Sequence, residues 1–246
     1  MDLISVEQVR IARDRADLVP GARPLGGGTW LYSEPQPDAV LLDLLGFGWE
    51  PVVRTATHLS IAATCTIATL RELPDSPLFR PLADALLASW KVQRRATVGG
   101  NIALALPAGP MTALAVGLDA ALTLWSADAT REIPAAEFVT GVVSTVLRPG
   151  EVVRSIEFPL DALAQPAAFR RISLAPLGRT GTLVTGRRTP DGVVLGVTGG
   201  TERPHVVTSL EQLDAVDDWY DDPHGSPDWR EAMTRRFAAE LVAELS

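Results

Sequence analysis

Hydrophobic residues recur along the chain with two different periods, and the mixture predicts an α+β fold. Leu82, Leu86 and Trp90 stand four positions apart, which predicts a helix from about Pro81 to Trp90. Short apolar runs bounded by Gly or Pro predict buried strands instead. These runs cover residues 40–44, 52–63, 121–125 and 152–158. Strands and helices do not alternate strictly, so a regular parallel α/β sheet is not expected.

Capping signals predict where further helices begin. Ser5-Val6-Glu7-Gln8 has the capping-box pattern, so we predict a helix that begins at Ser5 and ends before Pro20. Thr66 is the expected N-cap of a short helix that Pro74 stops. Another helix is expected over residues 111–118. A terminal helix is expected after Ser226, with one apolar face that holds Met233, Phe237, Leu241 and Leu245.

The pattern changes at about Gln165, which indicates a separate C-terminal part. Residues 182–189 and 193–198 are rich in β-formers and flank Thr189-Pro190-Asp191-Gly192. Proline presets φ and glycine accepts a positive φ, so this segment predicts a β-hairpin turn. The acidic stretch over residues 214–222 is interpreted as a solvated connection.

Composition and charge narrow the class of protein. The chain has 246 residues and a net charge of −8, which argues against nonspecific binding of nucleic acid or of anionic membranes. No run of about 18 apolar residues is present and the first residues lack a signal-peptide pattern, so we expect a soluble, cytoplasmic protein without membrane insertion. The single cysteine excludes an intramolecular disulfide and a self-contained iron–sulfur site.

Two glycine loops are the main candidates for binding chemistry. The first glycine loop covers residues 26–31, and the second, residues 96–102, follows about seventy positions later. Glycines let backbone N–H groups converge on an anion, and Thr29, Thr97 and Asn101 add polar groups that suit a phosphate or pyrophosphate. Neither loop is a P-loop or a Rossmann fingerprint. Taken singly, each loop is also compatible with an ordinary tight turn.

Other notable side chains indicate structural roles. Cys65 is expected to be buried apolar filler, and the three histidines are too dispersed for a metal site. Trp90, Trp125 and Trp229 are expected in the core. Trp30 lies in the first glycine loop, where it could stack on a cofactor ring or cover a partner surface. No Ser-His-Asp motif is recognisable, and we assign neither a catalytic residue nor a metal ligand.

The two glycine loops and three further segments occur in the same order as in a known protein family. The chain resembles the FAD-binding medium subunit of molybdenum hydroxylases, the group that contains xanthine, carbon monoxide, nicotinate and aldehyde dehydrogenases. Its second loop, Ala96-Thr97-Val98-Gly99-Gly100-Asn101-Ile102, is similar to the most specific motif of that family. The other matching segments are Gly26–Leu31, Leu118–Ala120, Ile133–Phe138 and Pro149–Pro159. The resemblance covers about residues 5–205.

The resemblance implies both a fold and a binding site. It implies a PCMH-like FAD-binding domain of two subdomains, residues 1–52 and 53–162, followed by a small C-terminal α+β domain of sheet and helices, residues 163–246. Val153 matches a position near the flavin in relatives, and Arg170 falls where many relatives carry a lysine near the isoalloxazine. The implied FAD-binding residues are Gly26, Gly27, Gly28, Thr29, Trp30, Leu31, Thr97, Gly99, Gly100, Asn101, Val153 and Arg170.

The resemblance also implies an electron-transfer function. In the family, a large subunit with the molybdopterin cofactor oxidises the substrate, and a small subunit with two [2Fe–2S] clusters passes electrons to FAD. We therefore expect FAD as the only cofactor of this chain, in a heterotrimer or a dimer of heterotrimers. The substrate and the terminal acceptor, whether NAD, quinone or oxygen, depend on features outside this sequence.

One departure from the family pattern favours a first alternative function, and a second alternative from another class also remains open. Relatives usually have an Asp that reaches the FAD ribose, and the aligned residue here is Pro110, which cannot accept that hydrogen bond. The first alternative is a scaffold subunit that binds FAD weakly or not at all. The second is a free-standing flavin oxidoreductase, which would need a cluster of titratable groups over the flavin.

Overall fold

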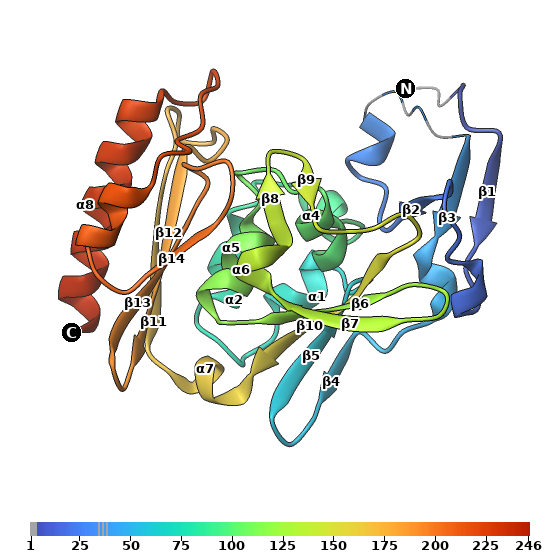
Figure 1. The fold of residues 1–246 in the computed structure, drawn as a ribbon, viewed down its shortest axis with the longest axis horizontal. Helices are drawn as coiled ribbons and strands as arrows, with labels where there is room; N and C mark the ends of the chain where they lie inside the picture. Colours follow the sequence, from blue (N-terminus) through green and yellow to red (C-terminus); the bar gives the residue numbers. More distant parts are fainter. Residues whose placement is uncertain (1–3, 34, 36, 38) are drawn as a thin grey trace.

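Three sheets follow one another from one end of the molecule to the other in chain order, with helices between and outside them (Figure 1). The computed structural model describes residues 4–33, 35, 37 and 39–246. Helices and antiparallel or parallel strands are mixed without βαβ regularity, which confirms the predicted α+β class. No helix among these described residues has both the length and the apolar character needed to cross a bilayer.

The N-terminal sheet has three parallel strands in the order β1-β3-β2. They are β1 (Gln8–Ile11), β2 (Arg23–Leu25) and β3 (Val40–Asp43). The helix predicted from Ser5 to Pro20 is therefore wrong. Residues 8–11 pair with β3, whose Leu41 and Leu42 are buried, and this tertiary pairing outweighs the local capping signal. Helical structure in that range is limited to a 3₁₀ turn over Arg15–Asp17.

The central sheet has five antiparallel strands in the order β4-β5-β10-β6-β7. The central strand β10 (Val152–Pro159) places Ile156 opposite Ile61 on one side and Leu122 on the other. This sheet confirms the strands expected at 52–63, 121–125 and 152–158. Its other strands are β4 (Val52–Arg54), β5 (His58–Ala62), β6 (Ala121–Trp125) and β7 (Thr130–Pro134).

Short helices cover the apolar face of the central sheet, where Phe79 meets Phe158 with ring centroids 5.6 Å apart. Thr66 caps α1 through its side chain, as predicted. The helices are α1 (Ile67–Arg71), α2 (Phe79–Asp84), α3 (Trp90–Gln93), α4 (Val98–Ala103), α5 (Pro110–Gly117), α6 (Ala135–Phe138) and α7 (Leu160–Ala164). A two-stranded ribbon, β8 (Val139–Gly141) with β9 (Ser144–Thr145), lies beside them.

The helix predicted over 81–90 is divided into two helices. α2 ends at Asp84, Leu87 adopts a left-handed φ of 54°, and the side chain of Ser89 accepts a hydrogen bond from Val92 N–H to begin α3. Trp90 consequently projects into solvent with 64% of its surface exposed, so the prediction that it belongs to the core is wrong. Trp125 and Trp229 are partly buried.

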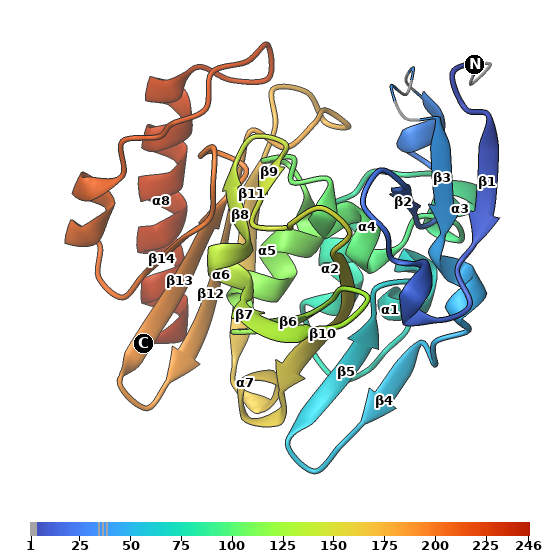
Figure 2. The same cartoon turned by 45° about the vertical axis from the view of Figure 1, so that its right-hand side comes forward.

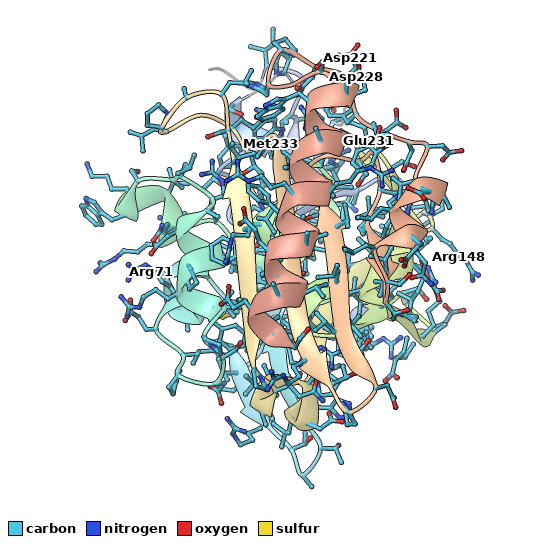
Figure 3. The ribbon with its side chains drawn as sticks, turned by 90° about the vertical axis from the view of Figure 1, so that its left-hand side faces the viewer. Arg71, Arg148, Asp221, Asp228, Glu231 and Met233 are labelled. Carbon is cyan, nitrogen blue, oxygen red and sulfur yellow. The ribbon has the colours of Figure 1, made fainter. Side chains whose placement is uncertain are left out.

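The C-terminal sheet is antiparallel, in the order β11-β12-β13-β14. Its strands are β11 (Ala167–Ile172), β12 (Thr182–Thr189), β13 (Gly192–Thr198) and β14 (His205–Val207). The predicted hairpin is confirmed, with Gly192 at a φ of 125°. The terminal helix α8 (Pro227–Leu245) lies across the outer face of this sheet (Figure 3), where Phe237 and Leu241 pack against Val184 and Leu195. The inner face contacts α5.

Candidate functional site

The two glycine loops lie directly against each other, although about seventy residues separate them in the chain. Gly27 approaches the backbone of Arg95 so closely that a Cβ built on it would stand 1.6 Å from the Arg95 carbonyl oxygen. Gly26 lies similarly over the side chain of Thr97. The N-terminal sheet and the segment α3–α4 are therefore in contact at this point (Figure 2), and the two candidate binding loops form one surface.

Thr97 lies between the two loops and is buried, with 3% of its surface exposed. Its Oγ1 caps α4 by accepting a hydrogen bond from Gly100 N–H at 3.1 Å. A Cβ on Gly26 or on Gly100 would lie 2.7 Å from the same Oγ1. Two glycines from different loops thus lie in close contact with one hydroxyl group, an arrangement that we call the Thr97 cradle. A side chain at either position would collide with this hydroxyl group.

The remaining glycines of the motif shape the loops. Gly99 packs against Ala63, whose Cβ would lie 2.3 Å from a Cβ at position 99. Gly28 adopts a left-handed φ of 71°, and a Cβ there would also meet the ring of Tyr32 at 2.5 Å. Gly27 and Gly99 therefore permit close backbone packing, and Gly28 permits the turn.

Backbone donors of the first glycine loop are available to a ligand. Within the described part of the chain, the N–H groups of Gly28, Thr29 and Trp30 donate to no protein acceptor. In the second loop, by contrast, Val98 N–H donates to Cys65 and Gly99 N–H to Ala63. Successive unpaired N–H groups in a glycine-rich turn are suited to bind an anion.

Asn101 connects the second glycine loop to α5. Its Oδ1 accepts a hydrogen bond from Met111 N–H at 3.0 Å, which leaves its amide N–H₂ group for other partners. Pro110 is the first residue of α5 and is buried. It has neither a backbone donor nor a polar side chain, so the polar group that the family pattern places here has no counterpart at this position.

A loop of the C-terminal sheet reaches the first glycine loop. The guanidinium of Arg179 lies 5.8 Å from the ring centroid of Trp30, a cation–π distance. Arg171 holds the same loop at its base, because it donates to Gly178 O and to Thr180 Oγ1, both at 2.6 Å. The structure therefore brings Trp30 together with a segment that the sequence motifs did not include.

Arg170 and Arg171 point to opposite faces of β11. Arg170 forms ion pairs with Glu240 and Glu244 of α8, and these carboxylates, Glu244 first, raise its pKa. Arg171 lies on the inner face with no carboxylate partner among the described residues, and burial lowers its pKa. Both line a shallow cavity of about 360 Å³ beside α2, together with Phe169 and Leu87.

Arg171 is a candidate site residue that the sequence analysis did not name. Adjacent residues on a strand face opposite sides of the sheet, so the sequence indicates that only one of the two arginines lies on the inner face. Choosing between them required knowing which face α8 covers. Val153 is buried in the main core, 4% exposed. FAD contact by Val153 and by Arg170 stays a prediction.

The described residues include potential metal ligands and the single cysteine of the chain. No group of three or more potential metal ligands occurs among the described residues. Cys65 is buried as expected, and desolvation raises the pKa of its thiol to about 11. A thiol of that kind is protonated at neutral pH and is unsuited to attack a substrate.

A family model matches well over half of the chain. The model, described as the FAD binding domain in molybdopterin dehydrogenase, covers residues 5–161. Among curated proteins, the chain is 28% identical to the carbon monoxide dehydrogenase medium chain of Afipia carboxidovorans over 61% of its own length and 55% of that chain. It is also 28% identical to aldehyde oxidase 2 of Macaca fascicularis, over 62% of this chain but 12% of that longer protein.

Solved structures share the fold over nearly the whole chain. A chain of carbon monoxide dehydrogenase from Hydrogenophaga pseudoflava superposes with a TM-score of 0.87 and 19% identity, covering 98% of this chain and 97% of that one. Quinoline 2-oxidoreductase from Pseudomonas putida 86 gives a TM-score of 0.83 and 20% identity over 100% and 98%. Sequence and fold agree, and the chain belongs to the family of FAD-binding domains of molybdopterin dehydrogenases.

Proposed function

We propose that this chain is the FAD-binding electron-transfer subunit of a molybdenum-dependent dehydrogenase. The observation that carries the proposal is the Thr97 cradle, in which two loops of a family-specific pattern meet around one hydroxyl group. The cradle offers small residues and the unpaired N–H groups of Gly28, Thr29 and Trp30 beside it. These features fit the pyrophosphate of a dinucleotide, which needs several donors and close backbone approach.

The residues of this chain would act by binding and orientation. The first glycine loop would donate to the pyrophosphate, and Thr97 and the amide of Asn101 would add side-chain contacts. Arg171 would place an unneutralised positive charge near the ring system, which favours added negative charge. FAD supplies the ability to exchange electrons singly or in pairs. No side chain needs to act as an acid or a base.

The partners belong to the same proposal. Relatives from Afipia carboxidovorans and Hydrogenophaga pseudoflava are named medium chains, that is, one of several subunits. We therefore propose a molybdenum-cofactor large subunit and a [2Fe–2S] small subunit as partners, in a heterotrimer or a dimer of heterotrimers. The domain ranges 1–52, 53–162 and 163–246 and the cytoplasmic location remain predictions.

Flavin content of the purified chain tests the proposal. We expect a flavin absorption spectrum with close to one FAD per chain, either as purified or after addition of FAD. Riboflavin, which lacks the pyrophosphate and the adenosine, serves as the matched ligand and should bind at least about tenfold more weakly, the effect of about 1.4 kcal/mol. Equal binding of FAD and riboflavin would show that the Thr97 cradle does not bind the pyrophosphate.

Pro110 favours one competing function, the flavin-free scaffold. A proline at this position removes a polar contact from α5, and no other described side chain of the first turn of α5 replaces it with a carboxylate. A colourless chain that also fails to take up added FAD would establish the scaffold and reject the electron-transfer proposal.

A further inference from the structure

A basic and aromatic surface lies on α3, outside the candidate FAD site. Trp90 is 64% exposed, and two cations lie over its ring, Lys91 at 5.7 Å and Arg94 at 5.2 Å from the centroid. Arg95 follows directly and is also exposed. We call Trp90, Lys91, Arg94 and Arg95 the α3 patch.

The cations of the α3 patch are unpaired. None of the three forms an ion pair with a described residue. Elsewhere some exposed arginines meet carboxylates, as Arg80 does with Glu72. Others, such as Arg10 and Arg148, form no ion pair with a described residue. On a chain with a net charge of −8, three adjacent unpaired cations form a local field of opposite sign.

The position of the patch relates it to the cradle. A Cβ on Gly27 would collide with the carbonyl oxygen of Arg95. The residues that follow α3 therefore lie against the first glycine loop. The surface continues from that loop through Trp30 to Arg179. Leu174 and Leu177, on the same C-terminal loop as Arg179, are 63% and 85% exposed. A molecule seated on α3 would therefore lie next to the candidate FAD site.

We propose that the α3 patch docks an acidic surface of the protein that donates electrons to this chain. The identity of the occupant as electron donor rests on the proposed function; its acidity follows from charge complementarity with the patch. An exposed Trp between cations has the composition of an interface hot spot, where Trp and Arg dominate binding. Three cations on an acidic chain are too few for stable binding to nucleic acid or to an anionic membrane, which favours a protein.

Charge reversal on α3 tests the proposal. The probe is the iron–sulfur subunit that co-purifies with the tagged wild-type chain, recognised by its [2Fe–2S] absorption, and the measurement is its dissociation constant at 50 and 200 mM salt. We expect Lys91→Glu with Arg94→Glu to weaken binding at least tenfold at 50 mM salt and to flatten the salt dependence. Trp90→Ala should weaken binding at both salt concentrations.

The matched control is Arg148→Glu with Arg236→Glu, which makes the same change in net charge on exposed side chains away from α3. It should change the dissociation constant less than twofold. FAD content is measured for every variant and should be unchanged, because the patch lies beside the cradle and not in it.

Several outcomes would overturn the docking proposal. These are equal weakening by the two double variants, tighter binding after reversal on α3, absence of an iron–sulfur protein from the wild-type preparation, or preferential binding to phosphatidylserine vesicles. Each can occur with FAD fully bound, so docking can fail while the flavin assignment stands. A colourless wild-type chain would instead reject the proposed function, whatever the patch binds.

Discussion

Thr97 joins two distant loops through a single side chain. A motif search identifies its glycines as a group, but it does not distinguish Gly26 and Gly100, which border the hydroxyl, from Gly27 and Gly99, which permit backbone packing. That distinction depends on which atoms face each missing Cβ, and these belong to residues far away in the sequence. At the scale of the residue, the location of the site was predictable from the sequence, and the separate roles of its glycines were not.

Gly100→Val is the sharpest test of the cradle. The new side chain would collide with Thr97 Oγ1 and displace it, so we expect FAD affinity to fall by about tenfold to a hundredfold, the effect of losing one hydrogen bond to a charged group. Isothermal titration with FAD measures it. Gly141→Val is the control, because the nearest atom to a Cβ there is 3.8 Å away. Undiminished FAD binding by the Gly100 variant would contradict the site assignment.

Pro110→Asp tests the departure from the family pattern. A carboxylate at the first position of α5 lies beside Asn101 and favourably near the helix N-terminus. If a ribose contact is missing in the wild type, we expect the variant to bind FAD about tenfold more tightly. Pro110→Ala, which adds no carboxylate, should leave the affinity near the wild-type value. An affinity that is equal or lower in the aspartate variant would show that no such contact is missing.

Elements with strong local signals were predictable, and elements that depend on a partner strand were not. The strand β10, the helix α5 and the turn before Gly192 all follow from apolar runs, Pro and Gly. The strand β1 was mistaken for a helix because its four residues are exposed and gain their order by pairing with β3. Likewise, residues 85–89 separate α2 from α3, and Leu87 within them has a left-handed φ.

A partly buried ion pair joins β7 to Glu151, the residue before β10. Arg131 donates to both oxygens of Glu151, at 2.9 and 2.7 Å, and Arg148 N–H adds a third hydrogen bond. Arg131 first, and the backbone of Arg148 after it, lower the pKa of Glu151 below 4.5. A carboxylate with a depressed pKa stabilises the fold above its unfolded-state pKa, and this stability is lost as the pH falls through the folded-state value.

We therefore expect Glu151→Gln to lower the free energy of unfolding by about 3 kcal/mol at pH 7. The difference between variant and wild type should shrink as the pH falls below about 4.5 and through the lowered pKa of Glu151, because the wild-type carboxylate then becomes protonated. Urea unfolding at several pH values measures it. Glu137→Gln, at an exposed position on α6, is the control and should change stability little. A difference that is constant with pH would show that Glu151 acts through packing alone.

At the scale of the whole molecule, an aromatic and cationic stack holds the N-terminal sheet on the central sheet. Arg15 lies 4.8 Å from the Trp125 ring centroid and donates to Ser126 O. Arg154 lies between Trp49 and Trp125, at 4.5 and 5.2 Å, and burial lowers its pKa. The sequence reveals each tryptophan, but the stack joins three segments and depends on their assembly.

Arg15→Ala should loosen this junction. We expect a lower melting temperature, faster proteolysis within residues 1–50 and weaker FAD binding, because the first glycine loop belongs to the N-terminal part. Limited proteolysis followed by mass spectrometry locates the cuts. Arg10→Ala, an exposed position on β1, is the control. Faster cutting in the C-terminal sheet instead would place the effect of Arg15 elsewhere.

The contact of Gly27 with the Arg95 backbone also makes the stability of the assembled chain depend on the supply of FAD. A binding site divided between the N-terminal sheet and the α3–α4 segment exists only in chains that have assembled both parts, so FAD would favour the fully assembled conformation by mass action. A hundredfold excess of FAD over its dissociation constant would add about 2.7 kcal/mol to stability. Cells short of flavin would then accumulate open, protease-sensitive chains, and the abundance of the subunit would follow the vitamin status of the cell.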